Sequence, residues 1–193
     1  EDFLPLSMST TGRLSGVVIA GFGITAKDRN YDDYAGLDVT GKLALILRHE
    51  PQENNANSPF DGKKLTSYAT FIDKMENAKR HGAKGVIFIN DRAAHPDATD
   101  KLEEFGTTGG PKDAGIFFVQ VKAVTAEKWF AAENRNLAEI EKGIDEDLKP
   151  RSFAFSKLNV DLAVDLSRIN KTVHNIAGYL DRKSTRLNSS HIP

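Results

Sequence analysis

The segment RHEPQE carries side chains that could bind a metal ion. His49, Glu50 and Glu53 lie close together in it, directly after the apolar run KLALILR. A zinc-binding helix places two histidines one helical turn apart, and Pro51 interrupts any such helix here. We therefore expect a solvated loop and assign no metal ligand to it.

Two other histidines, His95 and His81, also lack enough neighbouring ligand-type residues in the sequence to form a metal site. His95, in AAHPDATD, neighbours Asp97 and Asp100. These side chains could coordinate a cation only if other loops supplied the remaining ligands, so no site is assigned to them. His81 ends a predicted helix, where a cation complements the helix dipole and no ligand role is required.

Two further motifs have structural explanations. GFGITA lacks the third glycine of a dinucleotide-binding loop and is not followed by a helix, so a turn is expected there. In YDDY, the adjacent Asp32 and Asp33 would point to opposite faces of a strand, which does not suit an acid/base pair. No serine occupies a G-x-S-x-G elbow, and the chain has no cysteine. The spacing of residues thus predicts no catalytic residue and no metal ligand, and it leaves the binding residues unknown.

Composition limits the class of partner. The 193 residues are 39% hydrophobic and 27% charged, with a net charge of -1, which is ordinary for a globular domain. No basic stripe is interleaved with aromatic residues, so nucleic acid is not an expected partner. The longest apolar runs, such as GVIFI, are far shorter than the roughly 20 residues of a membrane span.

The elements that would position these residues are strands mixed with helices. Apolar runs predict buried strands at Val17 to Phe22, Lys42 to Arg48, Gly85 to Asn90 and Ile116 to Val121. Apolar residues at helical spacing predict one helix from Leu65 to the stop at Gly82, and a second from Thr125 that NRN could split in two. Without regular βαβ alternation, the expected fold class is α+β, in layers.

Alternation of apolar and polar residues predicts another strand between residues 160 and 166. Val160, Leu162, Val164 and Leu166 alternate with polar residues, and a second strand follows up to Leu180. We expect these two strands to pair antiparallel and to expose the apolar face, which predicts association of the isolated chain.

Several ordered blocks resemble one family. VVIAGFGI, YDDYAGLDVTGKLALILRHEPQE, SPFDG, NAKRHGAKGVIFIND, PRSFAF and NVDLAVDLSRINKTVHNIAGYL occur in sequence over nearly all of residues 3 to 180. Together they resemble the protease-associated domain of bacterial di-zinc exopeptidases, aminopeptidase relatives of glutamate carboxypeptidase and the transferrin receptor.

This resemblance implies a swivelling β/β/α domain that covers a peptidase active site and breaks no bond itself. It implies domains at 1–155 (protease-associated, with its N-terminal flank) and 156–180 (opening strands of a truncated peptidase domain). The two zinc ions would belong to the missing catalytic domain, so no cofactor is expected in this fragment, and His49, Glu50, His95 and His174 receive no zinc role.

The resemblance also implies the partners and the location. The partners would be a peptide or protein substrate and the chain's own peptidase domain, and the protein would be secreted, periplasmic or in the cell envelope. Loops are where such lids meet substrate, which favours the HEPQE loop and the loop from Asp91 to Ala114.

Three alternatives remain open. The parent could have carboxypeptidase specificity, the chain could be a stand-alone or receptor-borne module that binds peptides or proteins, or the same lid could serve a subtilisin-type serine protease. Residues 181–193 are interpreted separately, because Asp181 to His191 match, codon by codon, a common short-read sequencing adapter. We therefore expect a metagenomic fragment with a non-native tail.

Overall fold

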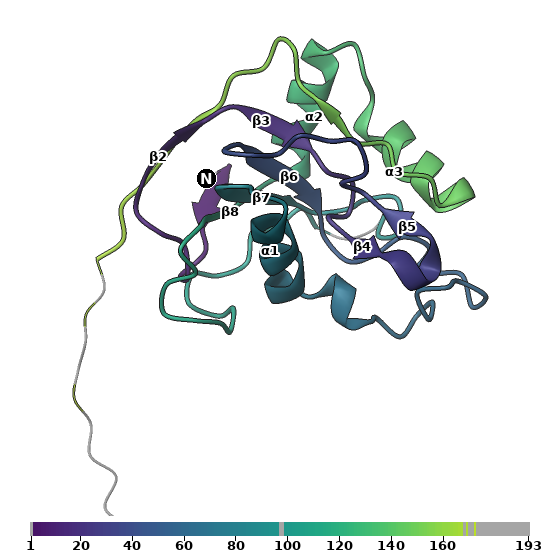
Figure 1. Cartoon of the computed structure of the whole chain (residues 1–193), viewed down its shortest axis with the longest axis horizontal. Helices are drawn as coiled ribbons and strands as arrows, with labels where there is room; N and C mark the ends of the chain where they lie inside the picture. The colour runs from purple at the N-terminus through teal and green to yellow at the C-terminus, as the bar shows by residue number, and fades with distance from the viewer. Residues whose placement is uncertain (1, 97–98, 168, 170–171, 173–193) are drawn as a thin grey trace, which may run out of the picture.

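The computed structural model describes residues 2–96, 99–167, 169 and 172, and its centre is one mixed β-sheet (Figure 1). Six strands form this sheet in the order β1-β8-β7-β6-β3-β9. Their bounds are β1 Phe3–Pro5, β3 Val17–Ile19, β6 Leu43–Leu47, β7 Gly85–Ile89, β8 Phe117–Val121 and β9 Phe153–Ala154. Strands β3, β6, β7 and β8 are parallel, whereas β1 and β9 pair antiparallel at the two edges.

The four predicted buried strands are confirmed. Every residue of β6, β7 and β8 is buried, as expected for parallel strands covered on both faces. The strand predicted from Val17 ends at Ile19, because the chain turns at the glycines that follow. The expected α+β architecture is confirmed by this mixed sheet and its helices.

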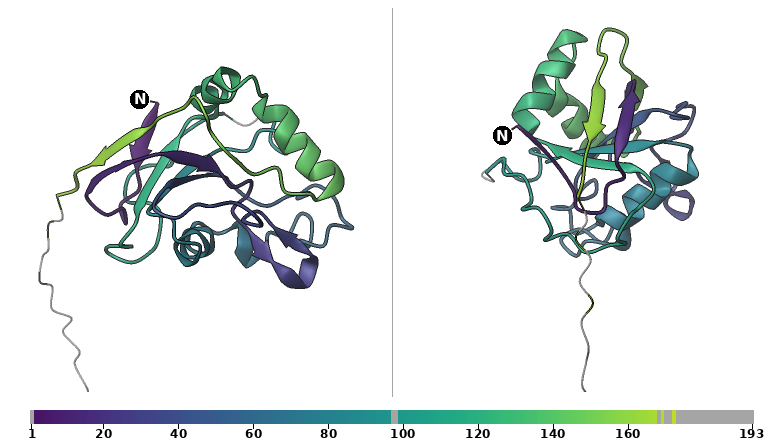
Figure 2. Two further views of the ribbon diagram at one scale, coloured as in Figure 1. Left: turned by 45° about the horizontal axis from the view of Figure 1, so that its top comes forward. Right: turned by 90° about the vertical axis from the view of Figure 1, so that its left-hand side faces the viewer.

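Helices cover both faces of the sheet (Figure 2). Alternate strand residues Val18, Ala44, Val86 and Phe118 pack with helix α1 (Phe71–Arg80) on one face. The opposite set, which includes Ile19, Leu45, Ile87 and Val119, packs with α2 (Ala123–Ala132) and α3 (Leu137–Asp147) on the other. The period of two along each strand therefore separates two cores.

Capping residues set the helix bounds. The first predicted helix is divided, because the Thr70 hydroxyl accepts from the Asp73 N–H and starts α1, after a short 3-10 turn η2 (Ser67–Ala69). The predicted split of the second helix is confirmed, since Asn136 caps α3. In the part of the chain described, no helix has both the length and the apolarity needed to cross a membrane.

The apolar face predicted to be exposed near residue 162 is buried instead. Strand β10 (Asp161–Val164) pairs antiparallel with β2 (Gly12–Ser15), so its partner comes from the start of the chain. Leu162 and Val164 are only 9% and 6% exposed, and Val160 and Leu166 are partly buried against the same core. The predicted basis for association is therefore wrong for this face. The predicted partner strand, up to Leu180, lies outside the described residues.

A small hairpin completes the fold beside α1. Strands β4 (Thr25–Ala26) and β5 (Tyr31–Asp32) pair antiparallel around the 3-10 turn η1 (Lys27–Arg29). The hairpin follows β3 directly, and its buried Tyr31 ring meets Phe60 edge-to-face at a centroid distance of 5.5 Å.

Candidate functional site

Strand register brings two loops together at the carboxyl edge of the sheet. Leu47, the last residue of β6, pairs with Ile89, the last residue of β7. His49 and Asp91 each follow two residues later, and the His49 Nδ1 atom lies 2.8 Å from Asp91 Oδ1. Because the strands are parallel, both loops leave the sheet at the same edge.

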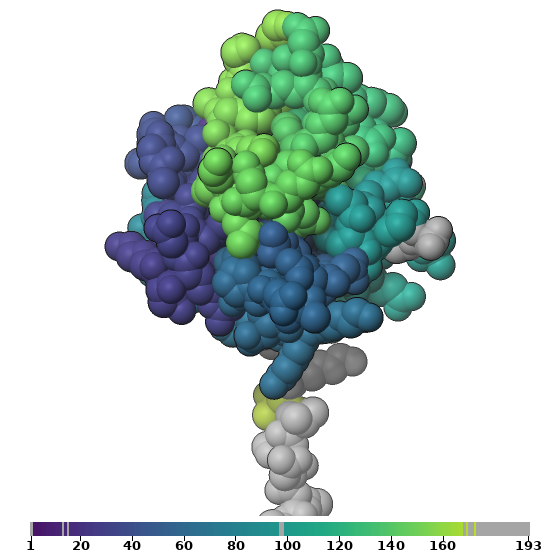
Figure 3. Space-filling model, turned by 90° about the vertical axis from the view of Figure 1, so that its right-hand side faces the viewer, coloured from purple at the N-terminus to yellow at the C-terminus, as the bar shows by residue number. Residues whose placement is uncertain are grey.

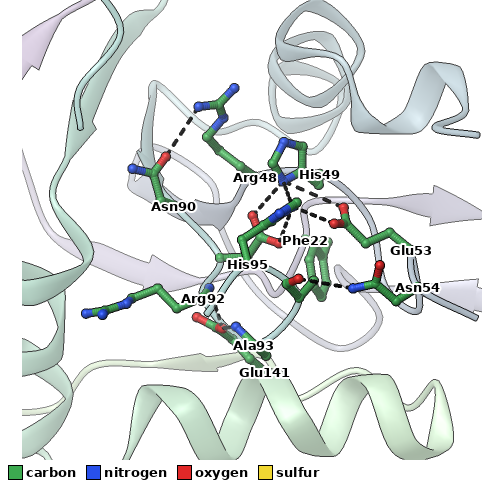
Figure 4. Close-up of polar contacts among 12 residues, drawn as sticks. Phe22, Arg48, His49, Glu53, Asn54, Asn90, Arg92, Ala93, His95 and Glu141 are labelled. Atoms are coloured by element: carbon green, nitrogen blue, oxygen red, sulfur yellow. Dashed lines mark hydrogen bonds and ion pairs between the residues drawn. The ribbon is translucent and has the colours of Figure 1, made fainter. Parts of the chain in front are cut away.

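Each loop then contributes a second side chain four residues further along. Glu53 follows His49 and His95 follows Asp91, so each loop supplies one imidazole and one carboxylate. We call these four residues the histidine–carboxylate cluster. One ligand-type atom from each of them lies within 4.8 Å of the other three. Figure 4 shows the two imidazoles and Glu53 pointing toward one another.

Short distances join the members of the cluster. His95 Nε2 lies 2.5 Å from Glu53 Oε1, 3.9 Å from Asp91 Oδ2 and 3.1 Å from His49 Nδ1. His49 Nδ1 lies 3.7 Å from Glu53 Oε2. The four side chains thus converge on one small volume.

The carboxylates of the cluster are buried, and the imidazoles are partly open. The Asp91 and Glu53 side chains are 2% and 7% exposed, against 24% for His49 and 37% for His95. Burial raises the pKa of Glu53, and the charge of Asp91 adds to this, although the two histidines oppose it. Glu53 Oε2 and Asp91 Oδ2 are buried and have no hydrogen-bond partner in the part of the chain that the structure describes.

A polar pocket opens beside the cluster. Both loops line it, and it carries charges of both signs. Its lining comprises Arg48, His49, Asn90, Asp91, Arg92, His95, Thr99, Asp100, Lys101 and Glu103. Arg48 Nη1 contacts Glu103 Oε1 at 2.6 Å across it.

Helix α3 holds both loops from outside. Glu141 Oε2 accepts the backbone N–H groups of Arg92 and Ala93, each at 2.9 Å. One turn later, Asp145 Oδ1 accepts the Gln52 N–H at 2.8 Å. In Figure 3 the green segment that contains α3 lies against the blue loop after β6 and the teal loop after β7. The loops therefore have fixed backbone positions.

Several sequence-level interpretations change at this site. The RHEPQE loop is not simply solvated, because Glu50 and Glu53 are buried. Glu50 accepts hydrogen bonds from the Thr66 N–H at 2.8 Å and the Thr66 hydroxyl at 2.5 Å. Asp100 lines the same pocket as His95 but is not part of the histidine–carboxylate cluster. Its carboxylate accepts the N–H groups of Ala123 and Val124 at the start of α2, each at 3.0 Å. Asp97 and His174 lie outside the described residues.

The interpretations of His81 and of the glycine motif agree with the structure. His81 is the C-cap residue of α1 and stacks on the Tyr34 ring at 4.2 Å. The GFG segment forms a turn against a buried carboxylate, and a Cβ at Gly21 would lie 2.2 Å from Asp33 Oδ1. This close approach, with a φ of +44°, explains the glycine without a phosphate ligand.

The cluster escaped sequence reasoning because its two halves are 42 residues apart, as the His49–Asp91 contact shows. One signal was present. Each half begins two residues after a buried strand and repeats a four-residue spacing between a histidine and an acidic residue. Searching parallel strand ends jointly, rather than single helices, would have paired them.

Comparison with known proteins identifies the family. No curated protein sequence matches the chain. Among solved structures, the aminopeptidase from Aneurinibacillus sp. strain AM-1 is 24% identical with a TM-score of 0.44, over 69% of this chain and 25% of its own. The zinc aminopeptidase BSAP from Bacillus subtilis is 19% identical with a TM-score of 0.42, over 82% of this chain and 29% of its own.

This chain therefore spans less than a third of the length of either structure. The model of the PA (protease-associated) domain matches residues 11–129, more than half of the sequence. That range contains β2 to β8, α1 and the entire histidine–carboxylate cluster. The chain belongs to the PA domain family.

Proposed function

We propose that this PA domain is a non-catalytic lid that shapes substrate access in a zinc-dependent exopeptidase, most simply an aminopeptidase. Membership of the family supports a peptidase-associated role. The ordered sequence blocks, which continue into the HNIAGYL segment, support an exopeptidase as the parent. The same resemblance supports export from the cytoplasm as part of this proposal.

The observation that carries the proposal is the pocket at the carboxyl edge of the sheet. The HEPQE loop and the loop after Asp91, both favoured from sequence as substrate-contacting loops, line it together. Exposed Arg92 and Lys101 lie on its rim. A peptide offers carboxylate and main-chain carbonyl groups that such cations bind.

Two measurements test this function. The 193-residue chain, given aminoacyl chromogenic substrates and zinc, should show no turnover. In the enzyme encoded by the complete gene, Arg92→Ala with Lys101→Ala should raise KM for peptides of several residues several-fold. The same pair should leave kcat/KM for a single-residue chromogenic substrate unchanged, because that substrate does not reach the lid.

The matched control is Lys128→Ala, which removes an exposed cation from α2 outside the pocket lining. Zinc-dependent turnover by the 193-residue chain at enzyme-like rates would refute the non-catalytic role. Equal losses on long and short substrates would refute the lid role of the pocket.

A further inference from the structure

Hydrogen bonding alone does not satisfy the histidine–carboxylate cluster. If His49 donates to Asp91 and His95 donates to Glu53, the two ring N–H groups face each other across 3.1 Å. If one ring nitrogen instead accepts from the other, its single lone pair is no longer available to a neighbouring carboxyl group. Each ring nitrogen offers one hydrogen or one lone pair and takes part in two of the three contacts, so the set forms two linear hydrogen bonds at most.

The buried carboxylate oxygens of the cluster are a second observation that hydrogen bonding does not explain. Among residues 2–96 and 99–167, nothing forms a hydrogen bond with Glu53 Oε2 or Asp91 Oδ2, although both carboxylates are more than nine-tenths buried. A buried, unsatisfied carboxylate oxygen is costly, on the order of 1–3 kcal/mol or more. Two such oxygens beside two ring nitrogens form a set of converging lone pairs, which a cation can accept together.

The spacing fits a small tetrahedral ion. With metal–ligand bonds of about 2.0–2.1 Å, a tetrahedral site separates its ligand atoms by roughly 3.3 Å. The contacts described above between atoms of different residues run from 2.5 to 3.9 Å and bracket that value. One ligand atom from each residue lies within 4.8 Å of the other three, so small side-chain adjustments bring all four to the tetrahedral spacing. Two imidazoles favour Zn²⁺ and related transition metals over Ca²⁺ and Mg²⁺, which prefer oxygen ligands alone.

We propose that His49, Glu53, Asp91 and His95 bind one divalent transition-metal ion, with Zn²⁺ preferred over Ca²⁺ and Mg²⁺. Four protein ligands close the coordination shell, so the ion is structural and clamps the loop after β6 to the loop after β7. Partly exposed His95 provides the entry path. The site lies inside the PA domain and is separate from the two zinc ions of the proposed peptidase, so it does not depend on the proposed function.

The anchoring contacts support preorganisation of this site. Glu141 fixes the backbone beside Asp91, and Asp145 fixes the backbone beside Glu53. The Asn54 side-chain amide also donates to the Ala94 carbonyl at 3.0 Å, which links the two loops directly. A metal ion therefore needs little rearrangement of the backbone to bind.

The test uses the whole 193-residue chain without a histidine tag, stripped with EDTA and returned to chelator-free buffer. Titration with ZnCl₂ should give one ion per chain by calorimetry and by elemental analysis. At 100-fold Kd, Zn²⁺ should raise Tm by about 5–10 °C, whereas Ca²⁺ and Mg²⁺ should not. Co²⁺ should bind with the intense visible absorption of a tetrahedral site.

Variants locate the ion. Changes to residues that only contact the metal ligands typically weaken metal binding by about 10–100-fold. His95 and Glu53 are proposed as ligands themselves, so His95→Gln or Glu53→Gln should weaken Zn²⁺ affinity by more than about 100-fold and abolish the Co²⁺ band. His81→Gln is the matched control, because His81 stacks on Tyr34 outside the cluster and should leave both readouts unchanged.

Any of three results from the zinc titrations would overturn the proposal: no stoichiometric Zn²⁺ binding by the stripped chain, affinity retained within threefold in His95→Gln, or an equal loss in His81→Gln. The Co²⁺ spectrum of the unmodified chain keeps the test decisive if Glu53→Gln fails to fold. An octahedral spectrum would exclude the closed four-ligand site.

Discussion

Among single residues, Asp33 and Lys74 stand out because both are ionisable and both are buried. Asp33 accepts the Ile24 N–H at 3.1 Å and the Tyr31 hydroxyl at 2.8 Å. Lys74 donates to the Phe22 carbonyl. Burial raises the pKa of Asp33 to about 7 and lowers the pKa of Lys74 to about 7, while the mutual attraction of the two charges opposes both shifts.

Lys74 contacts Phe22 in the GFG turn and Asp33 contacts Ile24 directly after it, which predicts coupled effects on stability. Asp33→Asn and Lys74→Met should each lower the free energy of unfolding by about 1–3 kcal/mol, because each leaves a buried hydrogen-bonding group without its partner. The double variant should lose less than the sum by about 0.5–3 kcal/mol. Urea denaturation at pH 7 measures all three.

Lys128→Met is the matched control on the exposed face of α2 and should change stability by less than about 0.5 kcal/mol. Additive losses in the double variant would show that Asp33 and Lys74 do not stabilise each other.

Residue-level prediction succeeded where the signal is local and failed where it is not. The GFG turn and the capping position of His81 were recognised from neighbours in sequence. The buried Glu50 and Glu53 were not, because their partners are Thr66 and the loop after β7. Burial of a charged side chain depends on contacts that a local pattern does not contain.

At the scale of elements, α3 connects the sheet core to the two loops of the candidate site. Its apolar residues Leu137, Ile140 and Ile144 enter the core on one face of the sheet. Glu141 and Asp145, one turn apart, receive hydrogen bonds from the loops after β7 and β6. The sequence predicted a helix here and its break at NRN, but it could not show which carboxylates would be buried.

The Glu141 carboxylate gives the helix a pH-dependent contribution to stability. Burial raises its pKa from 4.5 to about 7, although the Ala93 and Arg92 N–H groups oppose the shift. Between these values the unfolded chain ionises while the folded chain keeps its proton. The contribution of Glu141 to the free energy of unfolding therefore falls as pH rises from about 4.5 to about 7, by at most about 3 kcal/mol. Outside that window this contribution does not change with pH.

Glu141→Gln should remove this slope, because the amide oxygen still accepts both N–H groups but does not ionise. Denaturation at pH 5 and pH 7.5, with EDTA present, should show a smaller pH-dependent loss in the variant than in the unmodified chain. Glu139→Gln, an exposed neighbour on α3, should keep the original slope. Parallel pH profiles for the unmodified chain and Glu141→Gln would contradict the assignment.

For the whole molecule, short apolar runs in the sequence predict the central strands, but they do not predict how the two ends of the fold pair with each other. The predicted strands from 42 to 48 and 85 to 90 pair in parallel, as β6 and β7. In contrast, β10 pairs with β2, almost 150 residues earlier in the chain (Figure 1). Alternation identified the strand but not its partner, because pairing is decided by tertiary contacts.

This pairing bears on the predicted boundary between residues 155 and 156. Leu162 and Val164 pack into the core that also holds Val17 and Ile19. Burying two such side chains stabilises the fold by about 3–6 kcal/mol in total. We therefore expect a chain that ends after residue 167 to match the full chain in stability, and one that ends after residue 155 to lose most of that amount.

Urea denaturation and light scattering on the two truncated chains measure the effect. The shorter chain should also associate, because β2 loses its partner and becomes an open strand edge. Leu162→Ser with Val164→Ser in the full chain separates side-chain burial from chain length and should reproduce the loss of stability. Ile169→Ser, at a residue that is 82% exposed, is the matched control. If the chain ending after residue 155 is monomeric and as stable as the full chain, β10 belongs to the following domain and the boundary predicted from sequence holds.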